Sequence, residues 1–413
     1  MIREATMNKM FTGLLSAASI SALIASDAAA GGFMLREGSA SAIGAALAGR
    51  TSGDRDVSYS IHNPASLRGV QNFEASAGIA ALFADGESRS DAALPGFVSS
   101  DSPGEDAIIP SFTVGYRLND KLVVGFAVDS PFGLASEYNR DFVGSFDGVR
   151  SELTTITATP MVSYDFAPGF TVGAGVMIQY ADAELQSRVA GGPNGVADVS
   201  GDGFDVGYTI GALIEPVDGT VFGVNIQSGF SHKLDGSFSD NFPGVGGRSG
   251  TASFDLPAVV SVGVTQSITD DIRAMAEIEF ANWSAFDRIV IKDKATGALV
   301  ADDAQNYTNS VMVALGGEYD VSRDLTLRAG FAFDQTPTES AFRTVRVPDG
   351  NRWWFAAGAS YEITENIGID ASYLYLTIAD NNVTLRSPAT AGATVSNSNA
   401  DVHLFSANLR YKF

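Results

Sequence analysis

After about residue 70, the chain alternates between apolar residues and polar or small residues with a period of two. In the last segment His403, Phe405, Ala407, Leu409, Tyr411 and Phe413 fall on one parity, and Leu404, Ser406, Asn408, Arg410 and Lys412 on the other. The same split recurs over 170–180, 310–319 and 325–334. Because successive side chains of a strand point to opposite faces, this pattern predicts long β-strands with one apolar face.

The second face of these strands indicates their surroundings. A soluble β-sandwich also alternates, so alternation alone does not place the strands in a membrane. Strands of ten or more residues, with glycine, serine, threonine and single charges opposite a continuous apolar face, are typical of a wet lumen behind a lipid-facing wall. Aromatic residues near the expected strand ends fit an interfacial girdle: Tyr116, Tyr164, Phe166, Phe170, Tyr208, Tyr319, Tyr361, Tyr411 and Phe413.

Short turns and long connections alternate and give the expected number of strands. Six short polar turns are expected at 119–121, 167–169, 216–219, 269–271, 322–324 and 364–366. Seven long connections are expected at about 84–107, 130–152, 183–203, 230–252, 286–306, 335–351 and 379–401. Six and seven make thirteen connections, so we predict an all-β, 14-stranded antiparallel transmembrane β-barrel over 72–413, with its short turns in the periplasm. The last strand should pair with the first, because lipid offers no partners to an open sheet edge.

The first thirty residues have the layout of a secretory signal peptide. Arg3 and Lys9 precede an uncharged run from Met10 to Ser26, and a track of small residues ends at Ala30. The mature chain is expected to start at or next to Gly31. A short membrane anchor is the alternative interpretation.

Residues 31–71 carry apolar side chains among small ones but no long alternating run. A fourteen-stranded barrel is too wide for its own side chains to fill, so we expect this segment to fold into the lumen as a hatch, or plug. The small-residue pattern predicts a short helix at about Ser39–Ala48. A periplasmic extension is the alternative.

The composition argues against several functions. The 413 residues hold 26 lysines and arginines against 48 aspartates and glutamates, a net charge of −22, which is unsuited to binding nucleic acid. The chain has no cysteine and three scattered histidines, so no thiolate or histidine metal site is expected. No nucleophile elbow or triad is visible. We therefore expect neither an enzyme nor a cofactor or metal.

Several motifs in a fixed order resemble the FadL family of outer-membrane long-chain fatty acid transport proteins. The segments that carry the resemblance are Gly32–Phe33 with Glu37, Ser39, Ser41, Ala42 and Gly44; His62, Asn63, Pro64 and Ala65; Ser130–Glu137; Leu256–Pro257; Asn282–Phe286; and Asp334, Pro337, Arg346, Pro348, Asp349, Arg352 and Trp354. The stretch Asn63, Pro64, Ala65 is the hatch signature of that family. The resemblance covers nearly the whole mature chain and implies a barrel in the outer membrane of a Gram-negative bacterium.

The resemblance also implies a route for passive uptake of hydrophobic molecules. The ligand would enter an extracellular groove, pass to a lumen site, and leave sideways through a kink in the third strand. Here that strand is expected at Lys121–Asp129, with Gly125 inside it, followed by Pro131 and Gly133. Glycine weakens a strand and proline donates no ladder hydrogen bond, so these residues are the expected lateral gate. An ordinary proline at the start of a loop is the alternative.

A fatty acid carries a carboxylate, and its site would offer a cation or an amine. By parity Arg328, Arg352 and Asp370 face the lumen, and the mature amino terminus at Gly31 is a further candidate. The full expected set of ligand residues is Arg328, Arg352, Asp370, Gly31 and Phe33, with a loop groove formed by Leu134, Phe142, Val143, Phe146, Phe238, Phe242 and Val245. An ion-pair network that holds the hatch is the alternative role of the charged residues.

The identity of the ligand stays open at this stage. The basic residues of the family's fifth strand are not evident, since Tyr180 is followed by Asp182 and Glu184, which raises neutral aliphatic or aromatic hydrocarbons as alternatives. A structural or adhesin barrel and an open porin are the other hypotheses. Expected partners are a hydrophobic small molecule, outer-membrane lipid and lipopolysaccharide, and the barrel assembly machinery, which would read the terminal Tyr411 and Phe413. The barrel is expected to be a monomer.

Overall fold

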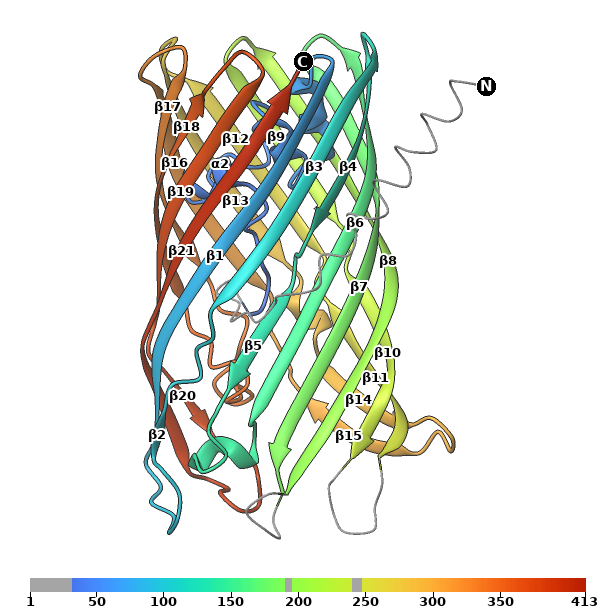
Figure 1. The fold of residues 1–413 in the computed structure, drawn as a ribbon, viewed down its shortest axis with the longest axis vertical. Helices are drawn as coiled ribbons and strands as arrows, with labels where there is room; N and C mark the ends of the chain where they lie inside the picture. The colour runs from blue at the N-terminus through green and yellow to red at the C-terminus, as the bar shows by residue number, and fades with distance from the viewer. Residues whose placement is uncertain (1–31, 190–194, 240–246) are drawn as a thin grey trace.

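The computed structural model describes residues 32–189, 195–239 and 247–413, which form a closed β-barrel with the amino-terminal segment inside it (Figure 1). The first strands are β1 (Phe73–Ser90), β2 (Ser100–Asp101), β3 (Ala107–Asn119), β4 (Leu122–Asp129), β5 (Gly133–Glu137), β6 (Arg150–Ala167), β7 (Phe170–Arg188), β8 (Val196–Val217), β9 (Thr220–Gln227) and β10 (Phe230–Ser239). The later strands are β11 (Arg248–Leu256), β12 (Val259–Ser267), β13 (Ile272–Ala281), β14 (Arg288–Asp293), β15 (Leu299–Ala304), β16 (Ser310–Asp320), β17 (Leu325–Asp334), β18 (Arg352–Glu362), β19 (Ile367–Ile378), β20 (Asn381–Thr384) and β21 (Thr394–Lys412). The helical segments are α2 (Ala40–Ile43), η1 (Val57–Ile61), η2 (Pro64–Gly69), η3 (Val143–Phe146) and η4 (Trp283–Ala285).

The barrel closes because its first strand pairs with its last. β1 lies antiparallel to β21 from Glu74, opposite Lys412, to Ser90, opposite Val395, and its other edge pairs with β3. Seven strands of the barrel consist of two segments each: β2 with β3, β4 with β5, β9 with β10, β11 with β12, β13 with β14, β15 with β16, and β19 with β20. Counted in this way the barrel has fourteen antiparallel strands, as predicted.

The alternation of side chains corresponds to the two faces of the wall. Along β21, Phe405 and Leu409 are 52% and 56% exposed, while Ser406, Asn408 and Arg410 between and beyond them are buried. The predicted short turns all lie at one end of the barrel and the long connections at the other (Figure 1). The short-turn end is therefore the periplasmic end, as in other outer-membrane barrels.

Two of the predicted long loops are largely strand, which corrects the sequence interpretation. Most of 183–203 continues β7 to Arg188 and begins β8 at Val196, and these two residues lie opposite each other in one ladder. Most described residues of 230–252 likewise belong to β10 and β11. Alternation does not mark where a strand leaves lipid, because the ladder continues into water. Phe238 lies in β10, whereas Phe242 and Val245 lie outside the described residues.

Residues 32–71 fill the lumen near the periplasmic end (Figure 1). The predicted helix Ser39–Ala48 is shorter than expected, because only Ala40–Ile43 is α-helical and positive φ values at Ala46 and Leu47 end it. No helix in the described part of the chain is long and apolar enough to cross a membrane. The predicted signal peptide and Gly31 lie outside the described residues.

Glycines of the barrel wall allow the hatch backbone to lie directly on the strands. A Cβ atom added at Gly330 would be 2.1 Å from the carbonyl oxygen of Ala45, and one at Gly223 would be 2.1 Å from that of Thr51. Both distances are far shorter than any van der Waals contact. The small residues on the inner face therefore make room for the hatch, and not only for water.

Candidate functional site

Two buried arginines of the hatch fix it to the barrel wall. Arg36 contacts Glu279 at 2.6 Å and Asp334 at 3.2 Å, and Arg50 contacts Glu277 at 3.8 Å and also pairs with Glu279. The carboxylates come from β13 and β17, and none of these five side chains is more than 5% exposed. Removing one partner of such a buried pair costs about 3–5 kcal/mol. These contacts hold the hatch in the lumen.

Arg328 and Asp370 are buried in the lumen, and both are bound by other protein groups. Arg328 Nε donates to Glu318 at 2.6 Å, and the same guanidinium donates to Ser360. Asp370 accepts from Arg410 Nε at 2.8 Å and from the Ser360 hydroxyl. This network crosses β16 to β21 near the periplasmic end, beside α2. A role of Arg328 or Asp370 in ligand binding stays a prediction.

Arg352 holds the start of the hatch. Its Nε and Nη2 donate to Asp349 Oδ1 at 2.9 and 2.5 Å, and Nη2 also donates to the carbonyl of Gly32 at 3.1 Å. The backbone N–H of Gly32 donates to Asp349 Oδ2 at 3.0 Å. The pair therefore clamps the backbone just before Phe33, and a ligand contact of Arg352 stays a prediction.

The third strand of the barrel is interrupted after Asp129. β4 ends there, β5 begins at Gly133, and both segments pair with β6. Between them, the N–H of Phe132 donates to Thr155 Oγ1 at 3.1 Å, and that hydroxyl donates to the Phe132 carbonyl at 2.6 Å. A side chain of β6 thus replaces ladder hydrogen bonds across the break, which also contains Pro131. The interruption is a built feature of the wall.

The hatch is hydrogen-bonded to this break. The N–H of Leu35 donates to the Pro131 carbonyl at 2.8 Å, and the N–H of Gly133 donates to the Phe33 carbonyl at 3.0 Å. The segments 33–35 and 131–133 therefore run antiparallel as a short bridge. A displacement of the start of the hatch must break or move this bridge.

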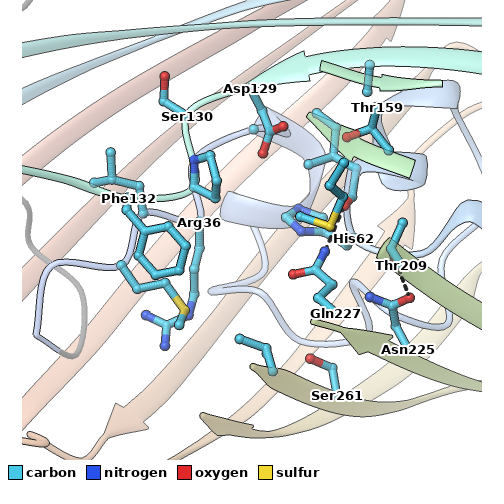
Figure 2. A pocket seen from close by; sticks show the side chains of 18 of the residues that line it. Arg36, His62, Asp129, Ser130, Phe132, Thr159, Thr209, Asn225, Gln227 and Ser261 are labelled. Carbon is cyan, nitrogen blue, oxygen red and sulfur yellow. Dashed lines mark hydrogen bonds between the residues drawn. The ribbon is translucent and has the colours of Figure 1, made fainter. Parts of the chain in front are cut away.

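A gap in the wall lies beside the break. β3 pairs with β4 only from Phe112 onward, so residues 107–111 bond to β1 alone, and β5 bonds to β6 alone among the described strands. A cavity in the lumen reaches both sides of the gap, since Ile109 and Pro110 of β3 and the stretch 129–132 line it (Figure 2). We call this space the gap cavity. Hatch residues 34–38 and 60–62 form its other side.

Gly125 lies inside the third strand, as predicted, but away from the break. It lies within β4 opposite Gly115 on one side and Met161 on the other, so it does not border the gap. A Cβ atom there would be 2.8 Å from the side chain of Leu67 in the hatch. Gly125 therefore makes room for the hatch, while the break is formed by the residues after Asp129.

A second, apolar groove opens on the side of the long connections. Its lining includes Phe33, Leu134, Leu153, Ala183, Leu185, Val199, Leu234, Ala252, Phe254, Phe286, Ile289, Ile291 and Val347. The space between these residues, which is partly open to solvent, is about 740 Å³. We call this space the outer groove.

An aromatic cluster separates the outer groove from the gap cavity. Phe33 packs edge-on against Trp283, Phe286 and Phe132, with ring centroids 4.8, 5.1 and 6.4 Å apart, and Tyr307 lies 6.4 Å away. Phe33 lines the groove and Phe132 lines the cavity. Phe33, a residue of the hatch, thus stands between the two spaces.

Arg346 is a cation of the outer groove that the sequence analysis did not select. Its Nη1 donates to the Arg150 carbonyl and Ser151 Oγ at 2.9 and 2.7 Å, and its Nη2 donates to the Gln186 carbonyl and Ser187 Oγ at 3.0 and 2.6 Å. All these acceptors are uncharged, and no carboxylate within the described ranges pairs with it. Burial lowers the pKa of Arg346 to about 10, so it stays protonated near pH 7. Asp303 and Asp147 act on this guanidinium only from beyond salt-bridge distance, and Glu152, which also lines the groove, pairs with Arg150.

The predicted groove residues are only partly brought together. Leu134 lines the outer groove, but Phe142 and Val143 are fully buried in a separate core of the long connections, with Val345 among their neighbours. Phe146 stacks against Phe97 with centroids 5.5 Å apart and does not line the groove. The backbone of the connections directs these side chains away from the lumen. They therefore pack within the connections and hold them together.

Asp182 and Glu184 stand in the fifth strand where the family resemblance implies cations. Asp182 is exposed, whereas its neighbour Ala183 and the next odd residue, Leu185, line the outer groove. Glu184 lies 3.5 Å from Arg150. Neither acid lines the outer groove, and the missing strand cations still leave a neutral ligand open.

The family model described as outer membrane protein transport protein (OMPP1/FadL/TodX) matches residues 21–413. The chain belongs to this family. It is therefore an outer-membrane protein of Gram-negative bacteria and not an enzyme, and it transports hydrophobic compounds.

Among curated relatives, the 47 kDa outer membrane protein of Pasteurella multocida is 27% identical over 98% of this chain and 99% of its own length. The long-chain fatty acid transport protein of Escherichia coli K12 is 23% identical over 86% of this chain and 90% of its own length. A crystal structure of a Pseudomonas aeruginosa FadL homologue has a TM-score of 0.85, at 23% identity over 92% of this chain and 100% of that one. The Ralstonia pickettii toluene transporter TbuX has a TM-score of 0.65, at 18% identity over 89% and 97%. These solved structures support the fold.

Proposed function

We propose that this chain takes up long-chain fatty acids across the outer membrane. A molecule enters the outer groove, passes the aromatic cluster when Phe33 moves with the hatch, reaches the gap cavity, and leaves sideways between β3 and β5. The observation that carries this proposal is that the two spaces lie in series, with a residue of the hatch between them and an opening in the wall beside the second.

Energetics favour a sideways exit over an exit into the periplasm. Each methylene group stabilises its transfer out of water by about 0.8 kcal/mol, so a sixteen-carbon chain strongly avoids an aqueous channel. The residues facing the gap cavity from the break are Asp129, Ser130, Pro131 and Phe132, and beyond the gap lies lipid. An acyl chain would then pass from this cavity, which has both apolar and polar lining residues, into lipid without crossing the periplasm.

Arg346 supports an acidic ligand over a neutral one. A ligand carboxylate beside it would form the direct ion pair that no described carboxylate makes with this guanidinium. Charge-assisted hydrogen bonds contribute roughly 1.5–3 kcal/mol. Phe33 and Leu134 would contact the hydrocarbon part of such a ligand.

Uptake of neutral hydrocarbons is the second candidate. Most residues that line the outer groove are apolar, and the fold is shared with the solved toluene transporters TbuX and TodX. A ligand without a head group would use the same two spaces and leave Arg346 without a partner.

Uptake by intact cells distinguishes the two candidates. The full chain is produced in a bacterium that lacks its own transporter of this family, and initial uptake of labelled hexadecanoate and toluene is measured against cells with an empty vector. We expect at least tenfold faster uptake of hexadecanoate. Faster uptake of toluene alone would support the second candidate, and no increase for either would contradict both.

A further inference from the structure

Two polar side chains without partners face the gap cavity. Figure 2 shows Asp129 at the end of β4 and His62 of the hatch pointing into this space. Within the described part of the chain, the Asp129 carboxylate has no hydrogen-bond donor or cation as a partner. His62 is 9% exposed, and its Nε2 is buried without a partner.

The other charged side chains that line the cavity are all engaged. Arg36 and Arg50 pair with Glu279 on β13. Glu37 accepts a hydrogen bond from the backbone N–H of Arg36 at 2.5 Å. Among the charged lining residues that the structure describes, Asp129 is thus the one without a partner in the protein.

The rest of the polar lining is neutral. Thr209 and Asn225 contact each other, with Thr209 Oγ1 donating to Asn225 Oδ1 at 3.0 Å, and Gln227 lies beside them (Figure 2). Burial, with the nearby Arg50 and Arg36 guanidinium groups, lowers the pKa of His62 well below its usual value. Its imidazole is therefore neutral at pH 7 and offers one donor and one acceptor nitrogen.

This arrangement suits one class of head group. The Asp129 carboxylate is partly buried and has no donor from the described protein groups, so a group that donates a hydrogen bond gains from binding there. An ionised ligand carboxylate would instead face a like charge, which disfavours it or raises its pKa. A hydroxyl or a protonated carboxyl donates to Asp129 and exchanges a second hydrogen bond with His62.

We propose that Asp129 and His62 form a head-group site, which receives the uncharged, hydrogen-bond-donating end of a long-chain amphipathic molecule before it leaves through the wall gap. This inference rests on the proposed function and deepens it. Arg346 selects an acid in the outer groove, and Asp129 requires that acid to be protonated at the exit. A long-chain alcohol is uncharged, so it can bind beside Asp129 without first taking up a proton.

The test compares matched ligands and an isosteric variant. Initial uptake of labelled hexadecanol and hexadecanoate at pH 8 is measured in cells that carry the full chain, after subtraction of empty-vector cells. In Asp129→Asn we expect the ratio of hexadecanol to hexadecanoate uptake to fall about tenfold, because a like charge shifts a neighbouring carboxyl by about one pKa unit or more. In His62→Leu we expect hexadecanol uptake to fall at least threefold.

Asp120→Asn is the matched control, because Asp120 lies in an exposed turn and does not line the cavity. Its uptake ratio should equal that of the original chain. Heat-modifiable mobility in detergent gels checks that each variant folds and reaches the outer membrane. If both ligands are taken up and Asp129→Asn leaves the ratio within twofold, this inference is overturned while the proposed function stands. If the unaltered chain takes up neither ligand, both are overturned.

Discussion

At the scale of single residues, the route carries opposite charges at its two ends. Arg346 supplies a cation in the outer groove, and Asp129 supplies a carboxylate in the gap cavity. Neither forms an ion pair with a described protein group, whereas Arg36 and Arg50 between them are paired. Charged groups without an ion-pair partner are often found at functional sites. The paired arginines hold the hatch, and our proposal assigns the unpaired groups to the ligand.

Replacing Arg346 by methionine should selectively weaken the binding of acids. Methionine keeps most of the apolar length of the side chain but removes the charge, so binding of hexadecanoate should fall about tenfold or more, equivalent to at least about 1.4 kcal/mol. Binding of hexadecane should change less than twofold. Displacement of a fluorescent fatty acid from the purified protein measures both.

Two further variants make this comparison specific. Arg346→Lys retains the charge and should recover part of the affinity for hexadecanoate. Arg343→Met removes an arginine of the same loop that donates to Thr338 and does not line the outer groove, so it should leave binding unchanged. Equal losses for hexadecanoate and hexadecane in Arg346→Met would instead indicate that the residue only holds the connections together.

The sequence predicts which way these residues face better than what they contact. Parity places Arg328 and Asp370 in the lumen correctly, because side-chain direction follows from the strand period alone. Their partners Glu318 and Arg410 come from neighbouring strands, and register between strands is not visible in one sequence. Arg346 appears in the sequence analysis only as part of a loop motif, and not as a ligand residue, for another reason. It lies in an irregular connection, where no period indicates direction.

At the scale of elements, the hatch and the broken third strand form one mechanical unit. The bridge between 33–35 and 131–133 joins them, and Phe33 closes the passage from the outer groove. The break and the hatch were predicted, whereas their contact was not, since residues about a hundred positions apart show no common pattern. The extent of β7 and β8 beyond the membrane was missed because hydrogen bonding, and not lipid, determines where a strand ends.

Locking the hatch to the break should stop transport. Met34 and Phe132 lie directly opposite each other in an antiparallel bridge, where Cα atoms are about 4.5–5.5 Å apart, a separation that a disulfide spans. The chain has no cysteine, so Met34→Cys with Phe132→Cys introduces a unique pair. Oxidised cells should lose at least 90% of hexadecanoate uptake, as initial-rate measurements would show.

Reduction provides the control for this experiment, because dithiothreitol should restore uptake to the level of the reduced double variant. Met34→Cys alone should not respond to oxidant. Undiminished uptake by a fully oxidised double variant would show that the hatch need not leave the break for a ligand to pass.

The glycines under the hatch give a second prediction at this scale. Gly330→Ala would bring a Cβ atom within 2.1 Å of the Ala45 carbonyl, so the hatch should shift from β17 although alanine is tolerated by the strand itself. We expect more frequent channel openings in planar bilayers, at least fivefold above the unaltered protein. Gly247→Ala, where nothing lies within 4 Å of the added atom, should behave like the unaltered protein. Equal opening frequencies in the two variants would contradict the packing argument.

At the scale of the whole molecule, the hatch depends on the barrel wall for its structure more than the wall depends on the hatch. The wall closes through the ladder between β1 and β21 without any hatch residue. The hatch has only short helical segments of its own, and its buried arginines need the carboxylates of the wall. The strand count and closure follow from turn spacing and from the absence of partners in lipid, so the architecture is the most predictable level of this protein.

This inequality leads to the last prediction. Deleting residues 32–71 should leave a folded barrel, because the exposed carboxylates Glu277, Glu279 and Asp334 would be hydrated in a wet lumen. The bore of a fourteen-stranded barrel is nearly as wide as that of a porin, so planar bilayers should show large, steady conductance. The deletion variant should also admit hydrophilic antibiotics and lose selective uptake of hexadecanoate. A properly folded deletion variant with the low conductance of the intact chain would mean that the long connections, and not the hatch, close the bore.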